Sequence, residues 1–255
     1  ENIADSHDSP RVNQFRPAAE ELAETDQFEP GDEFGQNVRE TFPLADIFID
    51  ATQKDEVEND IERLMEIIFG HPYHTPTRQE FGMFHAKAAA LRSADLSRQV
   101  GAAIATNNGD IVAVGTNEVP KGSGGLYWEE DEIDHRDFHR DTDSSTKMKG
   151  HMLKDILKHL QEGGWLCDEL GDSSSNELYE ACKADTEEAQ LMEVGEFGRS
   201  VHAEMAAIVD AARRGVSAED CILYTPPFPC HNCAKHIVAA GINRVVYIEP
   251  YPKSR

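Results

Sequence analysis

The sequence is poor in positive charge. It has 24 Lys and Arg against 48 Asp and Glu, which gives a formal net charge of −24 at pH 7. Proteins that bind long nucleic acids normally carry a basic patch that neutralises phosphates, whereas the few basic residues here are dispersed along the chain. The composition therefore argues against a DNA or RNA polymer as substrate and favours a small molecule.

Long apolar runs are also missing. A membrane-spanning helix needs roughly 18 or more consecutive apolar residues, and neither such a run nor a signal peptide occurs, so we expect no membrane partner. The phosphate-cradling motif G-x-x-x-x-G-K-[ST] is absent as well. The five cysteines are an odd number, and their scatter suits a reducing compartment. We expect a cytoplasmic protein of one large domain, or of one domain plus part of another.

Two short motifs predict a metal centre: His202-Ala203-Glu204 and Pro229-Cys230-His231-Asn232-Cys233. Zinc prefers imidazole nitrogen and thiolate sulfur, and a catalytic zinc keeps one of its four positions open for water. We therefore expect His202, Cys230 and Cys233 to bind Zn²⁺. Glu204 lies two residues from a ligand, where it can act as general acid and base on an activated water. A purely structural zinc site is the alternative, but it has no need of this carboxylate.

Each half of the predicted centre begins a helix. Cysteines three residues apart share one face of a helical turn, and the following run 234–240 is compatible with a helix that ends at Gly241. The run 205–214 is compatible with a second helix that ends at Gly215. The helix dipole favours thiolates at a helix N-terminus. We therefore predict that the zinc lies between two helix N-termini.

An H-x-E motif followed by P-C-x-x-C is the signature of zinc nucleobase deaminases. The flanking segments resemble the cytidine/deoxycytidylate deaminase superfamily over about 85–250, apart from an insertion at 124–199. The resemblance rests on expected strands at 99–104, 111–117, 221–225 and 244–248. It implies an α/β fold: a three-layer α/β/α domain with a mixed sheet, in which an antiparallel hairpin is followed by parallel strands.

The resemblance also implies a function. The expected reaction is the hydrolytic deamination of a free deoxycytidine nucleotide (dCMP, dCTP or both) to the deoxyuridine nucleotide and ammonia. Alternatives are a polynucleotide or tRNA deaminase and a non-catalytic, zinc-stabilised sensor domain. In the family an Asn at the end of the second strand holds a sugar hydroxyl, and Asn117 matches it. The remaining candidates for substrate binding are Arg98, Lys121 and Arg199, which could hold phosphate, together with Ala203 and Phe228.

Three further runs resemble a subgroup, the bacterial anti-phage deoxycytidylate deaminases: 121–128, 134–138 and 251–254. Those proteins carry a P-loop kinase-like domain ahead of the deaminase domain, and the resemblance implies antiviral defence by nucleotide depletion. The chain begins with Glu1, and we interpret it as a piece of a longer protein. We expect residues 1–70 to hold an acidic linker and the tail end of a P-loop-type α/β domain, with a strand at 44–50 and a helix at 56–69. Residues 71–255 would form the zinc deaminase domain.

The insertion at 124–199 contains an amphipathic helix at 148–160 and a weaker helical pattern at 177–192. We expect it to cover the substrate pocket or to make a contact within a homo-oligomer. Four histidines in this region raise the alternative of a second metal site, although surface histidines in an acidic loop are the simpler interpretation: His135, His139, His151 and His159.

Overall fold

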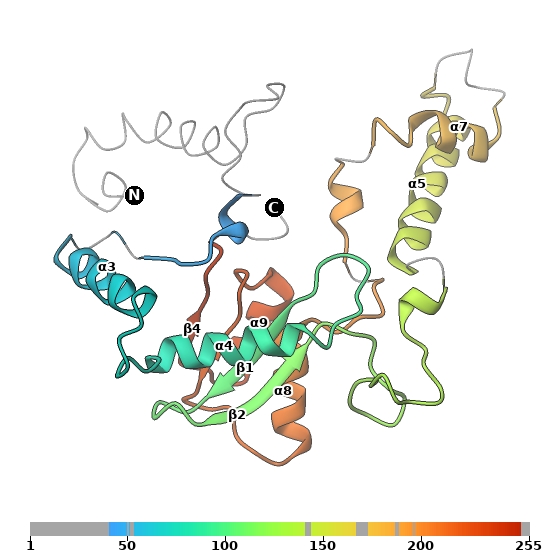
Figure 1. Cartoon of the computed structure of the whole chain (residues 1–255). Helices are drawn as coiled ribbons and strands as arrows, with labels where there is room; N and C mark the ends of the chain where they lie inside the picture. The colour runs from blue at the N-terminus through green and yellow to red at the C-terminus, as the bar shows by residue number, and fades with distance from the viewer. Residues whose placement is uncertain are drawn as a thin grey trace, which may run out of the picture. The chain divides into compact units, whose positions relative to one another are not determined.

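The computed structural model describes residues 41–49, 51, 54–140, 144–166, 173–186, 189–195 and 197–250. The chain forms two compact units, Glu1–Thr75 and Pro76–Arg255, which are considered separately below. The described helices and strands of the second unit confirm the predicted α/β class (Figure 1).

The second unit is built on a four-stranded mixed sheet with the order β2-β1-β3-β4. Strands β1 (Gly101–Ala105) and β2 (Ile111–Thr116) form the predicted antiparallel hairpin. Strands β3 (Ile222–Tyr224) and β4 (Arg244–Val246) pair in parallel, as expected for strands joined through a helix. The central contact between β1 and β3 is antiparallel, which the sequence did not predict.

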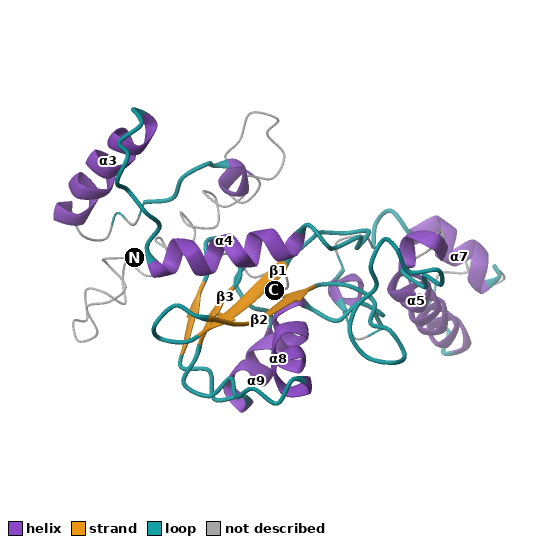
Figure 2. Cartoon of the chain, turned by 60° about the horizontal axis from the view of Figure 1, so that its bottom comes forward, coloured by secondary structure: helices purple, strands orange, loops and turns teal. Residues whose placement is uncertain are grey.

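Helices cover both faces of this sheet (Figure 2). Alternate residues of β1 point to opposite sides: Ala102 and Ile104 pack in the cluster with α8 (Ala203–Arg213) and α9 (His231–Ala239). Ala103 and Ala105 pack in the cluster with α4 (Arg78–Ala90). The three-layer arrangement is therefore confirmed. A capping box precedes α4, because Thr77 Oγ1 accepts the Glu80 N–H and Glu80 accepts the Thr77 N–H.

In the first unit, the predicted helix is present as α3 (Lys54–Ile68). The predicted strand at 44–50 is wrong over its described part, since Phe42–Leu44 form a 3₁₀ helix and residues 45–49 have no strand partner. Leu44 is 79% exposed and Ile47 is 48% exposed. The apolar run has the composition of a buried strand. A strand also needs a neighbouring strand, because its backbone N–H and C=O groups must be paired.

The insertion contains the predicted long helix as α5 (Ser144–Glu162). The weaker helical pattern at 177–192 corresponds to a short helix, α7 (Ser175–Cys182), and a 3₁₀ turn at Gln190–Glu193. The Thr186 hydroxyl bonds back to the Cys182 carbonyl at 2.9 Å, a local bond that competes with further helix. No helix in the described part of the chain is both long enough and apolar enough to cross a membrane.

Helix α8 lies unusually close to the sheet at Gly115. A Cβ added at this glycine would lie 2.1 Å from the Ala203 carbonyl oxygen and 2.3 Å from the Ala207 backbone nitrogen. Gly115→Ala must therefore push away the helix that carries His202 and Glu204. We expect a loss of about 1–3 kcal/mol in the free energy of unfolding together with reduced metal affinity. Urea unfolding checks this, with Gly122→Ala as the control because nothing lies within 4 Å of that position; equal stability of both variants would contradict the packing argument.

Candidate zinc site

The three predicted ligands lie together. His202 Nδ1 is 3.3 Å from the Sγ of Cys230 and 3.3 Å from the Sγ of Cys233. His202 is the N-cap of α8, and Cys230 is the N-cap of α9, so the site lies between two helix N-termini as predicted. The sequence folds this way because β3 is followed by a proline-rich turn that leads directly into α9.

The donor set fits zinc. Four-coordinate zinc with bonds of about 2.0 Å to nitrogen and 2.3 Å to sulfur places N and S roughly 3.5 Å apart, close to the observed 3.3 Å. Hydrogen bonding from Cys233 and the nearby His202 lower the pKa of Cys230 to about 3. The pKa of Cys233 is raised, because its thiol donates to Cys230 and is buried. These shifts favour a thiolate at Cys230 even without a bound metal.

Glu204 lies in the first turn of α8, immediately beside the three ligands. It is only 5% exposed, and this burial raises the pKa of its carboxyl group. A carboxyl group with a raised pKa exchanges protons more readily near neutral pH than an ordinary Glu does. Its position and environment therefore suit the predicted role of general acid and base.

Asn117 follows directly after β2 and is 8% exposed. Its side-chain oxygen accepts the Val100 N–H at 2.7 Å, and its amide nitrogen donates to the Arg98 carbonyl at 2.7 Å. The side chain therefore holds the segment before β1 against the end of β2. These two bonds use only one of the two N–H groups of the side-chain amide.

Each predicted phosphate-binding residue is paired with a carboxylate. Arg98 is bonded to Glu249, and Lys121 is bonded to Asp131. Arg199 contacts Asp137 at 2.5 Å and also donates to the His135 carbonyl at 2.8 Å. A phosphate that binds here would have to replace the carboxylate partner of one of these cations. The sequence could not reveal the pairing, because each partner lies on a separate segment.

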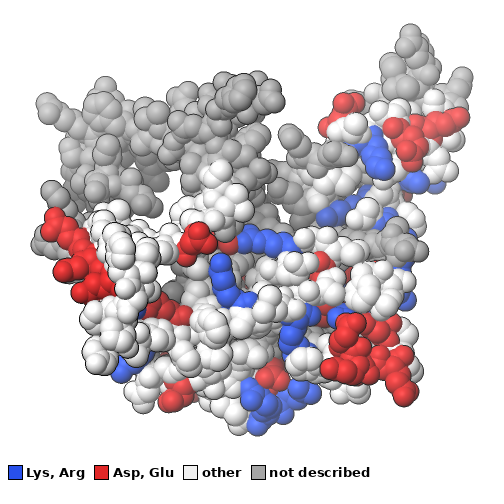
Figure 3. All heavy atoms as spheres, viewed as in Figure 1, with Lys and Arg blue, Asp and Glu red and all other residues white. Residues whose placement is uncertain are grey.

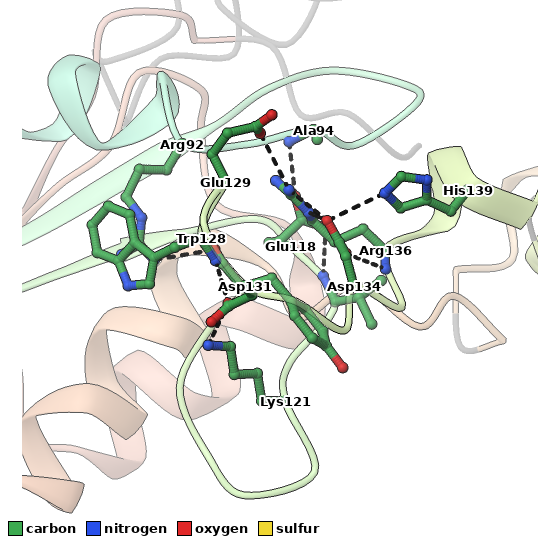
Figure 4. A network of polar contacts seen from close by, with 12 residues as sticks. Arg92, Ala94, Glu118, Lys121, Trp128, Glu129, Asp131, Asp134, Arg136 and His139 are labelled. Carbon is green, nitrogen blue, oxygen red and sulfur yellow. Dashed lines mark hydrogen bonds and ion pairs between the residues drawn. The ribbon is translucent and has the colours of Figure 1, made fainter.

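A buried polar network connects the end of β2 with the insertion (Figure 4). Glu118 is 1% exposed, and its carboxylate accepts the N–H groups of Ala94 and Val119, each at 2.8 Å. Arg136 is 6% exposed and bonds to Asp134, and this hydrogen bonding holds the pKa of Asp134 at about 2. Sequence analysis did not single out Glu118, because only tertiary packing shows that it is buried.

Two contacts involve aromatic rings. The Arg92 guanidinium stacks 3.4 Å from the ring centre of Trp128, a contact that sequence analysis also missed. The predicted residue Phe228 is 40% exposed and packs edge-on against Tyr247, with ring centres 5.0 Å apart. The predicted residue Ala203 is fully buried at the start of α8, so only its backbone could contact a ligand.

Ligand-type side chains come together in a second place. Over the described residues, two groups of three bring one ligand atom each within 4.8 Å of one another: His202, Cys230 and Cys233, and separately Glu66, His71 and His74. Neither group contains a histidine of the insertion. The alternative of a metal site built from the insertion histidines is therefore not supported by the described residues.

A family model matches the greater part of the chain. The model of the cytidine and deoxycytidylate deaminase zinc-binding region matches residues 76–249, a range that includes the three predicted ligands and Glu204. The chain belongs to this family.

Individual relatives match a shorter segment. Deoxycytidylate deaminase of Enterobacteria phage T4 is 46% identical over 55 residues, which are 22% of this chain and 28% of the relative. ComE operon protein 2 of Bacillus subtilis (strain 168) is 38% identical over 65 residues, 26% of this chain and 34% of the relative. The matches thus span about a third of these relatives. A crystal structure of dCMP deaminase from cyanophage S-TIM5 in complex with dCMP and dUMP gives a TM-score of 0.37 at 22% identity, covering 69% of this chain and 83% of that one.

Proposed function

We propose that the chain is a zinc-dependent enzyme that deaminates a free deoxycytidine nucleotide. The observation that carries the proposal is the buried carboxylate of Glu204 beside a His-Cys-Cys donor set with 3.3 Å spacing. Zinc held there by His202, Cys230 and Cys233 supplies an activated water at neutral pH. A site that is only structural would not require a buried carboxyl group next to its ligands.

The work of the protein is proton transfer and positioning. Glu204 takes a proton from the attacking water and delivers it to the ring nitrogen of the base, and afterwards to the departing ammonia. The N-termini of α8 and α9 surround the site with partial positive charge, which stabilises the thiolates of Cys230 and Cys233. Products are the deoxyuridine nucleotide and ammonia.

Support for deoxycytidine nucleotides comes from the similarity to the deoxycytidylate deaminase of Enterobacteria phage T4 and from the net charge of −24. Acidic side chains gather at the start of the insertion, where residues 129–132 are all Glu or Asp (Figure 3). Such a surface repels a polymer with many phosphates but can still admit one nucleotide. The proposed substrate is dCMP, dCTP or both. The same proposal includes a cytoplasmic location, a homo-oligomer and a role in phage defence by nucleotide depletion.

The test compares zinc-loaded and chelator-treated protein for ammonia release from dCMP, dCTP, cytidine and adenosine. The proposal expects release from dCMP or dCTP with the loaded protein and none after metal removal. Loaded protein that is inactive on every substrate would favour the non-catalytic sensor.

Asn117→Ala tests the sugar contact. The second N–H of this side-chain amide would bond the 3′-hydroxyl of a deoxynucleotide, and its loss leaves a buried partner unsatisfied at about 1–3 kcal/mol. We expect kcat/KM for the deoxynucleotide to fall by roughly one to two decades. Because Asn117 also holds the Val100 and Arg98 backbone, the substitution will lower stability as well.

A double-mutant cycle separates the two effects. Wild type and Asn117→Ala are each assayed with the deoxynucleotide and with its 3′-deoxy analogue. If Asn117 bonds the hydroxyl, the substitution costs little on the analogue. An equal loss on both substrates would assign Asn117 a purely structural role.

A further inference from the structure

A second metal-ligand cluster lies in the first compact unit, at the end of α3. Glu66, His71 and His74 bring one ligand atom each within 4.8 Å of one another. From this cluster we infer that the chain has a second divalent-metal site of the His-His-Glu type, independent of the deaminase centre and suited to zinc or a similar transition metal.

The backbone builds this arrangement. Gly70 has a φ of 79° and terminates α3, where the Gly70 N–H bonds to the Ile67 carbonyl at 3.0 Å and the His71 N–H bonds to the Glu66 carbonyl at 2.8 Å. These two bonds form a Schellman motif. These main-chain bonds therefore hold the backbones of Glu66 and His71 close together.

The next turn brings the third ligand back to the helix. An Arg63 guanidinium N–H donates to the Thr75 carbonyl at 3.2 Å, which ties the chain after His74 to α3. His74 Nε2 lies 2.5 Å from a Glu66 carboxylate oxygen. The rings of His71 and His74 have centroids 4.4 Å apart and are tilted by 40°. The three side chains thus converge from one helix end and one loop.

The geometry is close to what zinc requires. Bonds of about 2.0–2.2 Å in a tetrahedral site separate neighbouring N and O ligands by roughly 3.3–3.5 Å. The pair at 2.5 Å must open and the widest separation, at most 4.8 Å, must close. The side chains are free to do so, since those of His74 and Glu66 are 25% and 44% exposed. His71 Nδ1 would give up only a long contact of 3.4 Å from the Tyr73 N–H.

The charge around the cluster favours a cation. Helix α3 carries six acidic residues between Asp55 and Glu66, as its sequence KDEVENDIERLMEII shows, and acidic side chains gather over this helix in Figure 3. The cluster also lies at the C-terminal, partially negative end of the helix dipole.

The test is metal stoichiometry of the full chain after equilibrium dialysis against zinc, measured by elemental analysis. We expect two zinc ions per chain for the wild type and one for His71→Ala/His74→Ala. The matched control His151→Ala/His159→Ala removes two exposed histidines of α5 and should retain two. If the double variant folds poorly, Glu66→Gln keeps the shape of the side chain and should raise the Kd of the second zinc at least about tenfold, a loss typical even of residues that only support a ligand.

Cobalt identifies which site is lost. Co²⁺ bound to Cys230 and Cys233 gives a sulfur-to-metal charge-transfer band, which His71→Ala/His74→Ala should retain while losing one cobalt per chain. One zinc in the wild type, or equal zinc in the wild type and His71→Ala/His74→Ala, would overturn the second site. Because these readouts require no substrate, they stand or fall independently of the proposed deaminase activity.

Discussion

Glu204→Gln will abolish deamination and leave the zinc content of the chain unchanged. The amide is nearly isosteric with the carboxyl group but cannot accept and return a proton. Loss of general acid and base transfer alone lowers kcat by about 10²–10⁴-fold, and here one group serves several transfers. The measurements are kcat for ammonia release and zinc by elemental analysis.

The matched control for this variant is Glu219→Gln, which makes the same change at an exposed position of the same unit and should keep full activity. Activity of Glu204→Gln within a few-fold of the wild type would remove Glu204 from the mechanism. A simultaneous loss of zinc would instead show that Glu204 supports the ligands and would leave its catalytic role without evidence.

Cys233→Ala will lose one zinc per chain, the activity and part of the stability. The side chain is fully buried and its Sγ lies 3.3 Å from His202 Nδ1, so alanine leaves the predicted site one donor short. A ligand that binds only the folded state stabilises it by about 4 kcal/mol when its free concentration is a thousand times Kd. We expect a comparable drop in the free energy of unfolding in the presence of zinc, and the same direction for Cys230→Ala.

The control is Cys182→Ala, which removes a half-buried free thiol of α7 far along the sequence from both motifs. It should keep its zinc and its activity. The same unfolding curves measured in chelator should bring Cys233→Ala and the wild type close together, because the metal then contributes to neither. Full zinc occupancy in Cys233→Ala would show that the ligand set is wrong.

The grouping of His202, Cys230 and Cys233 could be predicted from the sequence because each of the two motifs begins a helix. A strand positions the first residue of the helix that follows it. The C-x-x-C spacing then places the second cysteine on the same helical turn as the first. His202 and Cys230 are both helix N-caps in the structure. The strand at 99–104, expected from the family resemblance, is present as β1, with Ala102 and Ala103 in opposite core clusters.

Features that depend on distant partners were not predictable in this way. The run 44–49 has strand-like composition, yet it lacks a neighbouring strand in the described structure. The burial of Glu118 depends on the Ala94 N–H from another segment, and the ion pair of Arg98 depends on Glu249 at the far end of the domain. Local patterns carry no information about such pairs. The residues predicted to bind phosphate therefore remain proposals.

The most direct test of the proposed function is a competition between free nucleotides and polymers. Zinc-loaded protein is given dCMP, dCTP, a cytosine-containing single-stranded oligonucleotide and tRNA at physiological salt, and kcat/KM is measured for each. The account predicts deamination of dCMP or dCTP with kcat/KM well above that for either polymer, and loss of this activity in Glu204→Gln. Faster deamination of single-stranded DNA or tRNA than of both nucleotides would contradict it.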